Sequence, residues 1–306
     1  MFIYKHFFFG NDKIPLMKTQ EYMFDEYADH LLYERLAAEE KNSGNKEILT
    51  KLSRQEYEHY IFWKKFMPDY QPVVSPFFLF RFCLMRRLFG LTFTIKFLER
   101  HEHVVIEEYK KVAAELTGEN KAQLEKIIND EKEHENFFIR QIQETVIKYI
   151  GFIALGLADA IVEITGVHAG FLGVTSSTLF AGISGLIVGF SAAISMGSAA
   201  YLQAKQDPHR SPWVSAIITG ISYILSVIML AIPYFLTQSM GYAFFFSILV
   251  GITLIALLTF YSAVVFDRRF LREFLETVSL MLLTALATFF LGTFLGKVFG
   301  IQQILG

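Results

Sequence analysis

The sequence predicts an all-α protein in two parts, a four-helix bundle followed by a five-helix transmembrane domain. Three observations predict it: a duplicated Glu-x-x-His motif, an uneven distribution of charge, and five long apolar segments in the second half. Residues 1–149 carry 24 of the 30 acidic and 22 of the 28 basic residues. We therefore expect a lead-in at residues 1–16, the bundle at 17–146 and the membrane domain at 147–306.

Composition limits the class of protein. Of the 306 residues, 53% are hydrophobic and the mean hydropathy is +0.38, which is too apolar for an ordinary soluble domain. The net charge of −2 argues against nucleic acid as a partner. The single cysteine, Cys83, excludes a disulfide or a cysteine-based zinc or iron–sulfur site within one chain. The start MFIYKHFFFG lacks the features of a signal peptide, and we expect a disordered or interfacial segment without an assigned role.

The first half contains an internal repeat. Glu26 and Glu102 are each followed seven residues later by a tyrosine, Tyr33 or Tyr109, and then by an Ala-Ala-Glu sequence. A Glu-x-x-His motif follows the two glutamates after 30 and 29 residues, as Glu56-x-x-His59 and Glu131-x-x-His134. The duplication predicts two helical hairpins, in which Tyr33 and Tyr109 fill the core near the motifs.

Helix-ending residues set the expected limits of these hairpins. The predicted helices are 17–42, 45–67, 91–117 and 119–147, with a long crossover at 68–90 between the hairpins. The crossover contains the apolar and basic sequence FFLFRFCLMRRLFG. It lies either along a membrane surface, with its basic groups toward the headgroups, or packed on the bundle, and the sequence leaves both alternatives open.

The repeated motifs predict a buried site for two metal ions. In Glu-x-x-His, a carboxylate and an imidazole lie one helical turn apart on the same face. Carboxylates can bridge two cations, and one imidazole per metal suits Fe(II) or Mn(II). Solvated charge on amphipathic helices is the alternative for any single glutamate, but two matched motifs favour the metal site. The expected ligands are Glu26, Glu56, His59, Glu99, Glu102, Glu131 and His134.

This half resembles the rubrerythrin branch of the ferritin-like superfamily, over residues 20–146 and through those seven positions. The resemblance implies a ferritin-like bundle that binds two iron ions as its cofactors, with manganese as the alternative metal. Rubrerythrins usually also carry a four-cysteine electron-transfer module, which the single cysteine here cannot form. A self-contained peroxidase cycle is therefore not expected, and we assign no catalytic residue.

Five apolar segments follow, each near the ~20 residues needed to cross a bilayer. They cover residues 147–168, 176–203, 213–235, 242–266 and 274–299. The loops at 203–210 and 267–273 contain five lysines and arginines, whereas those around 169–175 and 236–241 contain none. The positive-inside rule then predicts a multi-pass protein of the cell membrane, or of an organelle membrane in a eukaryote, with a cytoplasmic N-terminal domain.

Polar side chains within the spans mark a candidate ion path. Asp159 and Glu163 lie four residues apart in the first span, and intramembrane carboxylates usually serve ion or proton movement. A structural hydrogen bond across the helix interface is the alternative. His168 at the end of this span and Met196 in the second span are further candidates. Glycines in the second and fifth spans, including Gly292, Gly296 and Gly300, predict close helix packing.

The first two spans resemble the vacuolar iron transporter family, through the sequence LGLADAIVEITGVHAG and the Gly/Ser-rich second span that follows it. The whole chain resembles the fused erythrin–vacuolar iron transport proteins, which are also called membrane-bound ferritins. The resemblance implies a homodimer with lipid around it, Fe²⁺ as substrate, protons as counter-ion, and Asp159 and Met196 on the path. The family often has a glutamate where this chain has Ala200, and an acidic insert between spans two and three that is absent here.

We therefore expect a transporter that exports ferrous iron or manganese from the cytoplasm. The bundle would capture the metal, and ferroxidase activity of the bundle is an open part of this expectation. Two alternative functions fit the sequence as well. One is a membrane-anchored di-iron oxidase or peroxidase, and the other is an iron-storage or sensing protein without transport.

Overall fold

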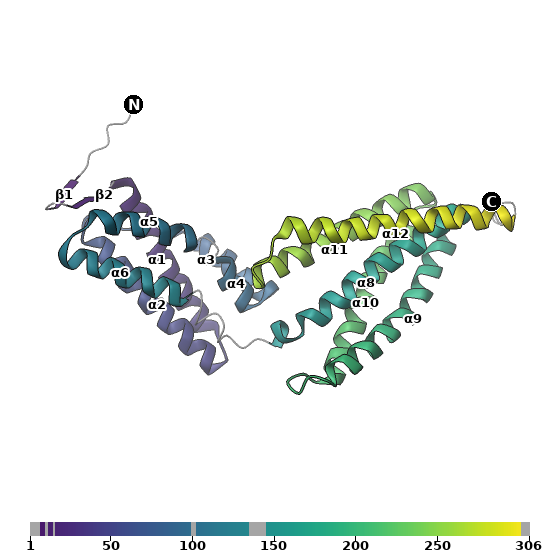
Figure 1. Ribbon diagram of the computed structural model, residues 1–306, viewed down its shortest axis with the longest axis horizontal. Coiled ribbons are helices and arrows are strands. Elements are labelled where there is room, and N and C mark those ends of the chain that lie inside the picture. The colour runs from purple at the N-terminus through teal and green to yellow at the C-terminus, as the bar shows by residue number, and fades with distance from the viewer. Residues whose placement is uncertain (1–6, 10–11, 15, 99–101, 135–144, 301–306) are drawn as a thin grey trace, which may run out of the picture. The chain divides into compact units, whose positions relative to one another are not determined.

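The computed structural model describes residues 7–9, 12–14, 16–98, 102–134 and 145–300, and the side chains of residues 18–98, 104–134 and 148–300. The chain divides into two compact units, residues 1–144 and 145–306 (Figure 1). The first unit holds the charged half of the sequence and the second holds the apolar half. The regular elements of the described residues are helices, apart from one short pair of strands.

That pair of strands lies in the lead-in. Strands β1 (Phe7–Phe9) and β2 (Asp12–Ile14) are antiparallel, with Phe7 opposite Ile14. The segment that we expected to be disordered or interfacial therefore contains two paired strands.

Helices α1 (Leu16–Glu39) and α2 (Ser43–Lys64) form the first helical hairpin. Asn42 caps α2, because its Oδ1 accepts a hydrogen bond from the Asn45 backbone N–H at 3.0 Å. Buried side chains recur along α2 every three or four residues, which is the spacing of one helix face. They include Leu49, Leu52, Glu56, His59 and Trp63.

The crossover between the hairpins contains a helix of its own, α3 (Pro76–Phe89). Ser75 caps it and Pro76 takes the first helical position, where its missing N–H costs nothing. Gly90 then adopts a φ of 91°, which only glycine tolerates readily, and the chain turns into α4 (Leu91–Leu98). Helix α3 packs against α1 and α4, so one face of the crossover is packed on the bundle.

Helices α5 (Glu102–Glu115) and α6 (Gly118–Glu133) form the second hairpin. Met23 of α1, Trp63 of α2, Tyr109 of α5 and Leu124 of α6 belong to one cluster of buried side chains, so the two hairpins share a hydrophobic core. The predicted single helix at 91–117 is described as α4 and α5. Residues 99–101, and the predicted continuity of the fourth helix with the first span at 135–144, lie outside the described residues.

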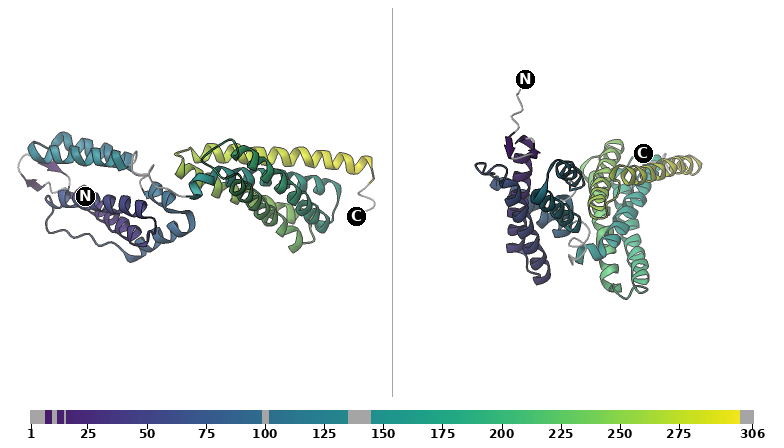
Figure 2. Two further views of the ribbon diagram at one scale, coloured as in Figure 1. Left: turned by 90° about the horizontal axis from the view of Figure 1, so that it is seen from below. Right: turned by 60° about the vertical axis from the view of Figure 1, so that its left-hand side comes forward.

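The second unit consists of five long helices, each long and apolar enough to cross a membrane. They are α8 (Thr145–Val174), α9 (Thr178–Ala204), α10 (Pro212–Leu236), α11 (Met240–Val265) and α12 (Phe270–Val298). Helix α12 lies along α8, and α10 packs against both α8 and α9 (Figures 1 and 2). Large apolar side chains remain exposed on the outer faces of these helices, as expected for contact with lipid, among them Phe190, Ile217, Phe245, Leu283 and Phe294.

Glycines allow the helices of this unit to approach closely. A Cβ atom on Gly292 of α12 would lie 2.1 Å from the Gly170 carbonyl oxygen of α8, and one on Gly156 would lie 2.4 Å from the Thr219 carbonyl oxygen of α10. Small residues at helix crossings are typical of membrane proteins. Gly292 and Gly296 are buried, as the predicted packing face requires, whereas Gly300 lies beyond the end of α12 with a φ of 65°.

Substitution of Gly292 by alanine should destabilise the second unit by about 1–3 kcal/mol, because the added methyl group meets backbone that cannot move aside. Gly151→Ala is the matched control, since Gly151 lies within α8 and a Cβ atom there would meet nothing within 4 Å. Thermal unfolding of the full-length protein in detergent should show a lower midpoint for Gly292→Ala only. An equal midpoint for both variants would contradict this packing.

Candidate metal centre

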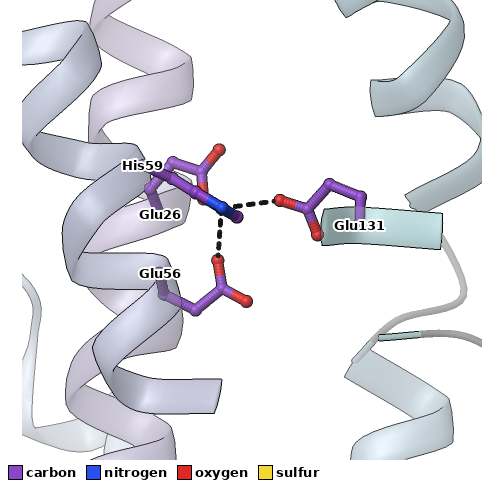
Figure 3. A group of neighbouring side chains, drawn as sticks. All are labelled: Glu26, Glu56, His59 and Glu131. Carbon is purple, nitrogen blue, oxygen red and sulfur yellow. Dashed lines mark ion pairs between the residues drawn. The ribbon is translucent and has the colours of Figure 1, made fainter. Parts of the chain in front are cut away.

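Four buried side chains meet between the two hairpins of the first unit. They are Glu26 from α1, Glu56 and His59 from α2, and Glu131 from α6 (Figure 3). Each offers one ligand atom, and these atoms all lie within 4.8 Å of one another. His134, one turn after Glu131, is fully buried beside them.

Helix periodicity and apolar neighbours fix these side chains. Glu56 and His59 lie three residues apart and therefore share one face of α2. Trp63, one further turn along α2, is fully buried in the core that both hairpins contribute to. On α6, Ile127 and Ile128 are buried just before Glu131. The apolar side chains thus hold the polar ones inside the bundle.

Glu56 and Glu131 each place one oxygen near each imidazole. Glu56 Oε2 lies 3.3 Å from His59 Nδ1, and its Oε1 lies 3.1 Å from His134 Nδ1. Glu131 Oε1 lies 2.8 Å from His59 Nδ1, and its Oε2 lies 3.2 Å from His134 Nδ1. The two rings are stacked with their centroids 5.9 Å apart. This arrangement would allow the two carboxylates to be shared between two metal positions, each with its own imidazole.

Glu26 would complete one of these two positions. Its Oε2 lies 3.5 Å from His59 Nδ1, on the side of His59 rather than His134. The Tyr109 hydroxyl donates a hydrogen bond to Glu26 Oε1, and the Trp63 indole N–H donates to the Tyr109 hydroxyl oxygen at 3.1 Å. Tyr109 is thus more than core filler, because it orients one of the clustered carboxylates. The contact of Trp63 was not predicted from the sequence, since it joins residues 46 positions apart.

Burial and mutual contact change the proton affinities of this cluster. Burial raises the pKa of Glu26 to about 8, which the hydrogen bond from His59 only partly offsets. Burial alone would lower the pKa of His59 and His134, but hydrogen bonds to the surrounding carboxylates outweigh it and hold both well above the usual value. Burial would raise the pKa of Glu56, yet the hydrogen bonds and charges of the two histidines lower it. In the absence of metal, protons therefore balance the buried negative charge.

The chemistry of these residues fits two metal ions. Three carboxylates and two imidazoles supply hard oxygen donors with one nitrogen for each metal position, a set suited to Fe(II) or Mn(II). The Nδ1 atoms of both histidines face carboxylate oxygens at distances of 2.8–3.5 Å, where a cation can replace a shared proton. The cluster is therefore compatible with a di-iron site.

Two of the seven predicted ligands cannot be placed. Glu99 lies outside the described residues, and Glu102 begins α5 but its side chain lies outside the described side chains. The structure thus brings together Glu26, Glu56, His59, Glu131 and His134 and leaves the contribution of the third helix of the bundle as a prediction.

Asp130 is a neighbour of the site that sequence reasoning missed. Its Oδ2 lies 3.5 Å from His59 Nε2, the ring nitrogen that points away from the cluster, and 3.9 Å from Lys126 Nζ. A carboxylate in this place can orient an imidazole that binds metal through its other nitrogen. The signal in the sequence is weak, because the repeat has Gln55 at the matching position before Glu56.

A cavity of about 330 Å³ adjoins the cluster within the first unit. Its lining includes the cluster residues Glu26 and Glu131, the acidic residues Asp25 and Asp29 of α1, and Phe78 and Phe82 of α3. Burial raises the pKa of Asp25 to about 6, and the neighbouring charge of Glu21 adds to the effect. The cavity gives small solutes space beside the buried ligands, with carboxylates along its wall.

The two predicted carboxylates of the second unit lie on α8. Glu163 accepts a hydrogen bond from the Tyr223 hydroxyl of α10 at 2.5 Å, and Tyr223 is fully buried. Asp159 and Glu163 are both partly exposed, so neither is enclosed by the helices of one chain. Tyr223 is a polar partner that the sequence did not predict, because it comes from a different span.

The other two candidates for the ion path, His168 and Met196, have surroundings unlike those of the two carboxylates. His168 is fully buried, its ring centroid lies 4.1 Å from that of Tyr234, and neither ring nitrogen has a hydrogen-bond partner among the described residues. A Cβ atom on Gly185 would lie 2.4 Å from His168 Nε2, so the glycine makes room for the ring. Met196 on α9 is partly buried against the apolar core of the unit, as ordinary packing would place it.

Comparison with protein families finds one match in each half of the chain. Residues 20–142 match the Rubrerythrin family, and residues 204–293 match the VIT family. The first match contains all five clustered ligands, whereas the second contains α10, α11 and most of α12 but not Asp159 or Glu163. No curated protein matches the chain. Together with the five apolar helices, the second match identifies an integral membrane protein.

Substitution of either bridging carboxylate should reduce metal binding. Glu56→Gln and Glu131→Gln each remove one charged oxygen shared between the two positions, and we expect metal content to fall from two ions per chain to fewer than one. Glu125→Gln, an exposed substitution on α6, is the matched control. Elemental analysis of full-length protein loaded with Fe(II) under anaerobic conditions checks this, and two ions retained by Glu56→Gln would refute the bridging role.

Metal loading should release protons, and the apparent affinity should increase as pH rises from 6 to 8. Glu26, with a pKa of about 8, and both histidines, with raised pKa values, hold protons that the cations must displace. Because these pKa values are raised by folding, the folded metal-free protein binds more protons between pH 6 and 8 than the unfolded chain does. Its free energy of unfolding should therefore decrease as pH rises. Proton release into weakly buffered solution, titrated with Mn(II), measures the first effect. An affinity independent of pH would contradict it.

Proposed function

Because this chain joins a rubrerythrin domain to a VIT-family domain in one integral membrane protein, we propose that it exports ferrous iron from the cytoplasm. In this proposal the bundle captures the metal ion and the membrane domain carries it across the bilayer. Manganese is the alternative substrate, since the same donor set suits it.

One observation supports the proposal most strongly. The same chain contains a buried cluster whose two carboxylates each face two imidazoles, and five helices able to cross a membrane. A storage or redox bundle alone needs no more than a single anchor. Five helices with carboxylates among them favour movement of an ion.

The distribution of charge supports a cytoplasmic position for the bundle. The loop that joins α9 to α10 carries Lys205 and Arg210, and the start of α12 with the turn before it carries Arg268, Arg269 and Arg272. The loops at the other end, residues 175–177 and 237–239, carry no charge. With five spans, the basic loops lie on the same side as the N-terminal bundle, which the positive-inside rule assigns to the cytoplasm.

Within the membrane domain we assign the path to Asp159 and Glu163. Both are partly exposed on α8, and Glu163 is oriented by Tyr223. Carboxylates in a bilayer are costly and therefore usually face an ion path or a partner. Met196 and His168 are the further candidates on this path. Exchange against protons and assembly as a homodimer, in which a second copy covers these carboxylates, belong to the same proposal.

The bundle would hold iron through Glu26, Glu56, His59, Glu131 and His134. Iron bound there would bring redox chemistry that permits ferroxidase activity. The neighbouring residues of the chain support the site. Tyr109 orients Glu26, Asp130 contacts the Nε2 atom of His59, and the buried core excludes bulk water. The cavity beside Asp25 and Asp29 supplies an approach for the cation.

Transport by the full-length protein in liposomes tests the function. In vesicles whose bundles face outward, export appears as uptake of Fe(II), followed with a metal-sensitive dye inside. Asp159→Ala should reduce the flux about tenfold or more, because loss of one charged ligand removes at least about 1.4 kcal/mol of stabilisation. Glu276→Gln, exposed on α12 and paired with Arg272, is the control and should retain flux.

Equal flux through the wild type and Asp159→Ala would remove Asp159 from the path. Binding of two iron ions by the bundle without any flux through the wild type would refute export and favour storage or sensing.

A further inference from the structure

Helix α3 is apolar on two opposite faces, and the bundle covers only one of them. On the covered face, Leu79 and Phe82 pack against the buried cluster around Leu32 and Leu49, and Cys83 is buried. Arg86 on this side is paired with Glu40 at 2.8 Å and so fastens the helix to the end of α1. A helix with apolar side chains on two opposite faces normally packs through both of them.

The opposite face of α3 carries four exposed apolar side chains. Phe77, Phe80, Leu84 and Leu88 are 66%, 58%, 42% and 67% exposed. Their spacing of three, four and four residues places them in one row along the helix. We call this row the outer face of α3. Contiguous exposed apolar rows of this kind usually mark a surface that binds something.

Arginines border the outer face on both sides. Arg81 is exposed beside Phe77 and Leu84 on one side of the row, four and three residues away along the helix. Arg87 on the other side is 73% exposed, with Glu39 Oε2 3.9 Å from its guanidinium. No acidic residue occurs in α3. An apolar row with cationic borders is the pattern of a helix that lies in the interface of an anionic bilayer.

We propose that the outer face of α3 binds the surface of a lipid bilayer that contains anionic lipids. The four apolar side chains enter the boundary between headgroups and acyl chains, and Arg81 and Arg87 contact lipid phosphates. The five membrane helices of the same chain keep the bundle close to such a surface. A second copy of the chain is a poorer occupant, because a symmetric pairing of two outer faces brings the arginines of both copies together.

This inference does not depend on the proposed transport. It requires neither a metal ion nor flux, and either could fail while the other holds. It concerns only the crossover helix of the first unit and the lipid that surrounds the protein.

Quenching by lipid acyl chains tests the contact in the full-length protein. In a Cys83→Ala background, Phe80→Cys carries an environment-sensitive fluorophore, and Glu125→Cys on α6 carries the same label as the matched control. The proteins are placed in nanodiscs of phosphatidylcholine with phosphatidylglycerol, with and without brominated acyl chains. We expect brominated lipid to reduce the fluorescence at position 80 and leave that at position 125 unchanged.

Two comparisons make the result specific. Reversal of charge in Arg81→Glu with Arg87→Glu, or omission of phosphatidylglycerol, should weaken the quenching at position 80. A label at Leu84→Cys repeats the measurement should the Phe80 variant fold poorly. Equal quenching at positions 80 and 125, or none at position 80, would overturn the proposal. Absence of quenching, together with crosslinking of two unlabelled chains through the Phe80→Cys sulfur, would assign the outer face to a second copy.

Discussion

Three carboxylates and two imidazoles are enclosed between two helical hairpins, and the fold of the first unit depends on what balances their charge. Glu56 and Glu131 come from different hairpins, yet each faces both histidines. Buried charges of one sign would separate the hairpins unless protons or cations lay between them. In the absence of metal, the raised pKa values of Glu26, His59 and His134 keep protons on these side chains, and these protons balance the negative charge. Cations at the same positions would join the hairpins through coordination bonds.

Much of this could be predicted from the sequence, because the determinants are periodic or local. The duplicated motif and its spacing identified Glu56, His59, Glu131 and His134 as neighbours, since residues one turn apart share a helix face. The preceding repeat added Glu26. The five membrane helices followed from the length and apolar character of their segments. These features need no knowledge of how distant parts of the chain meet.

The contacts that the sequence did not reveal join residues far apart in the chain. Tyr109 donates to Glu26, and Tyr223 donates to Glu163, across helices whose relative rotation no local pattern specifies. Asp130 was overlooked because its counterpart in the repeat is Gln55. The helix within the crossover was missed for another reason. Its FFLFRFCLMRRLFG sequence is apolar without a single face, so it showed neither clear amphipathic periodicity nor the length of a membrane span.

The glycine contacts of α8 have a consequence for how the membrane domain can change shape. Gly156 and Gly292 bring the backbone of α8 directly against the backbones of α10 and α12, where no side chain can rotate to absorb a displacement. At these two crossings α8, which carries Asp159 and Glu163, is therefore held firmly against α10 and α12. Three glycines of α9, Gly182, Gly185 and Gly189, instead meet the side chains of Tyr234, His168 and Val227, whereas Gly197 faces the Ala216 carbonyl oxygen of α10 at 3.2 Å. The half of α9 that contains Gly182, Gly185 and Gly189 can therefore adjust by rotamer changes of its neighbours, whereas the half that contains Met196 is held against α10 at Gly197.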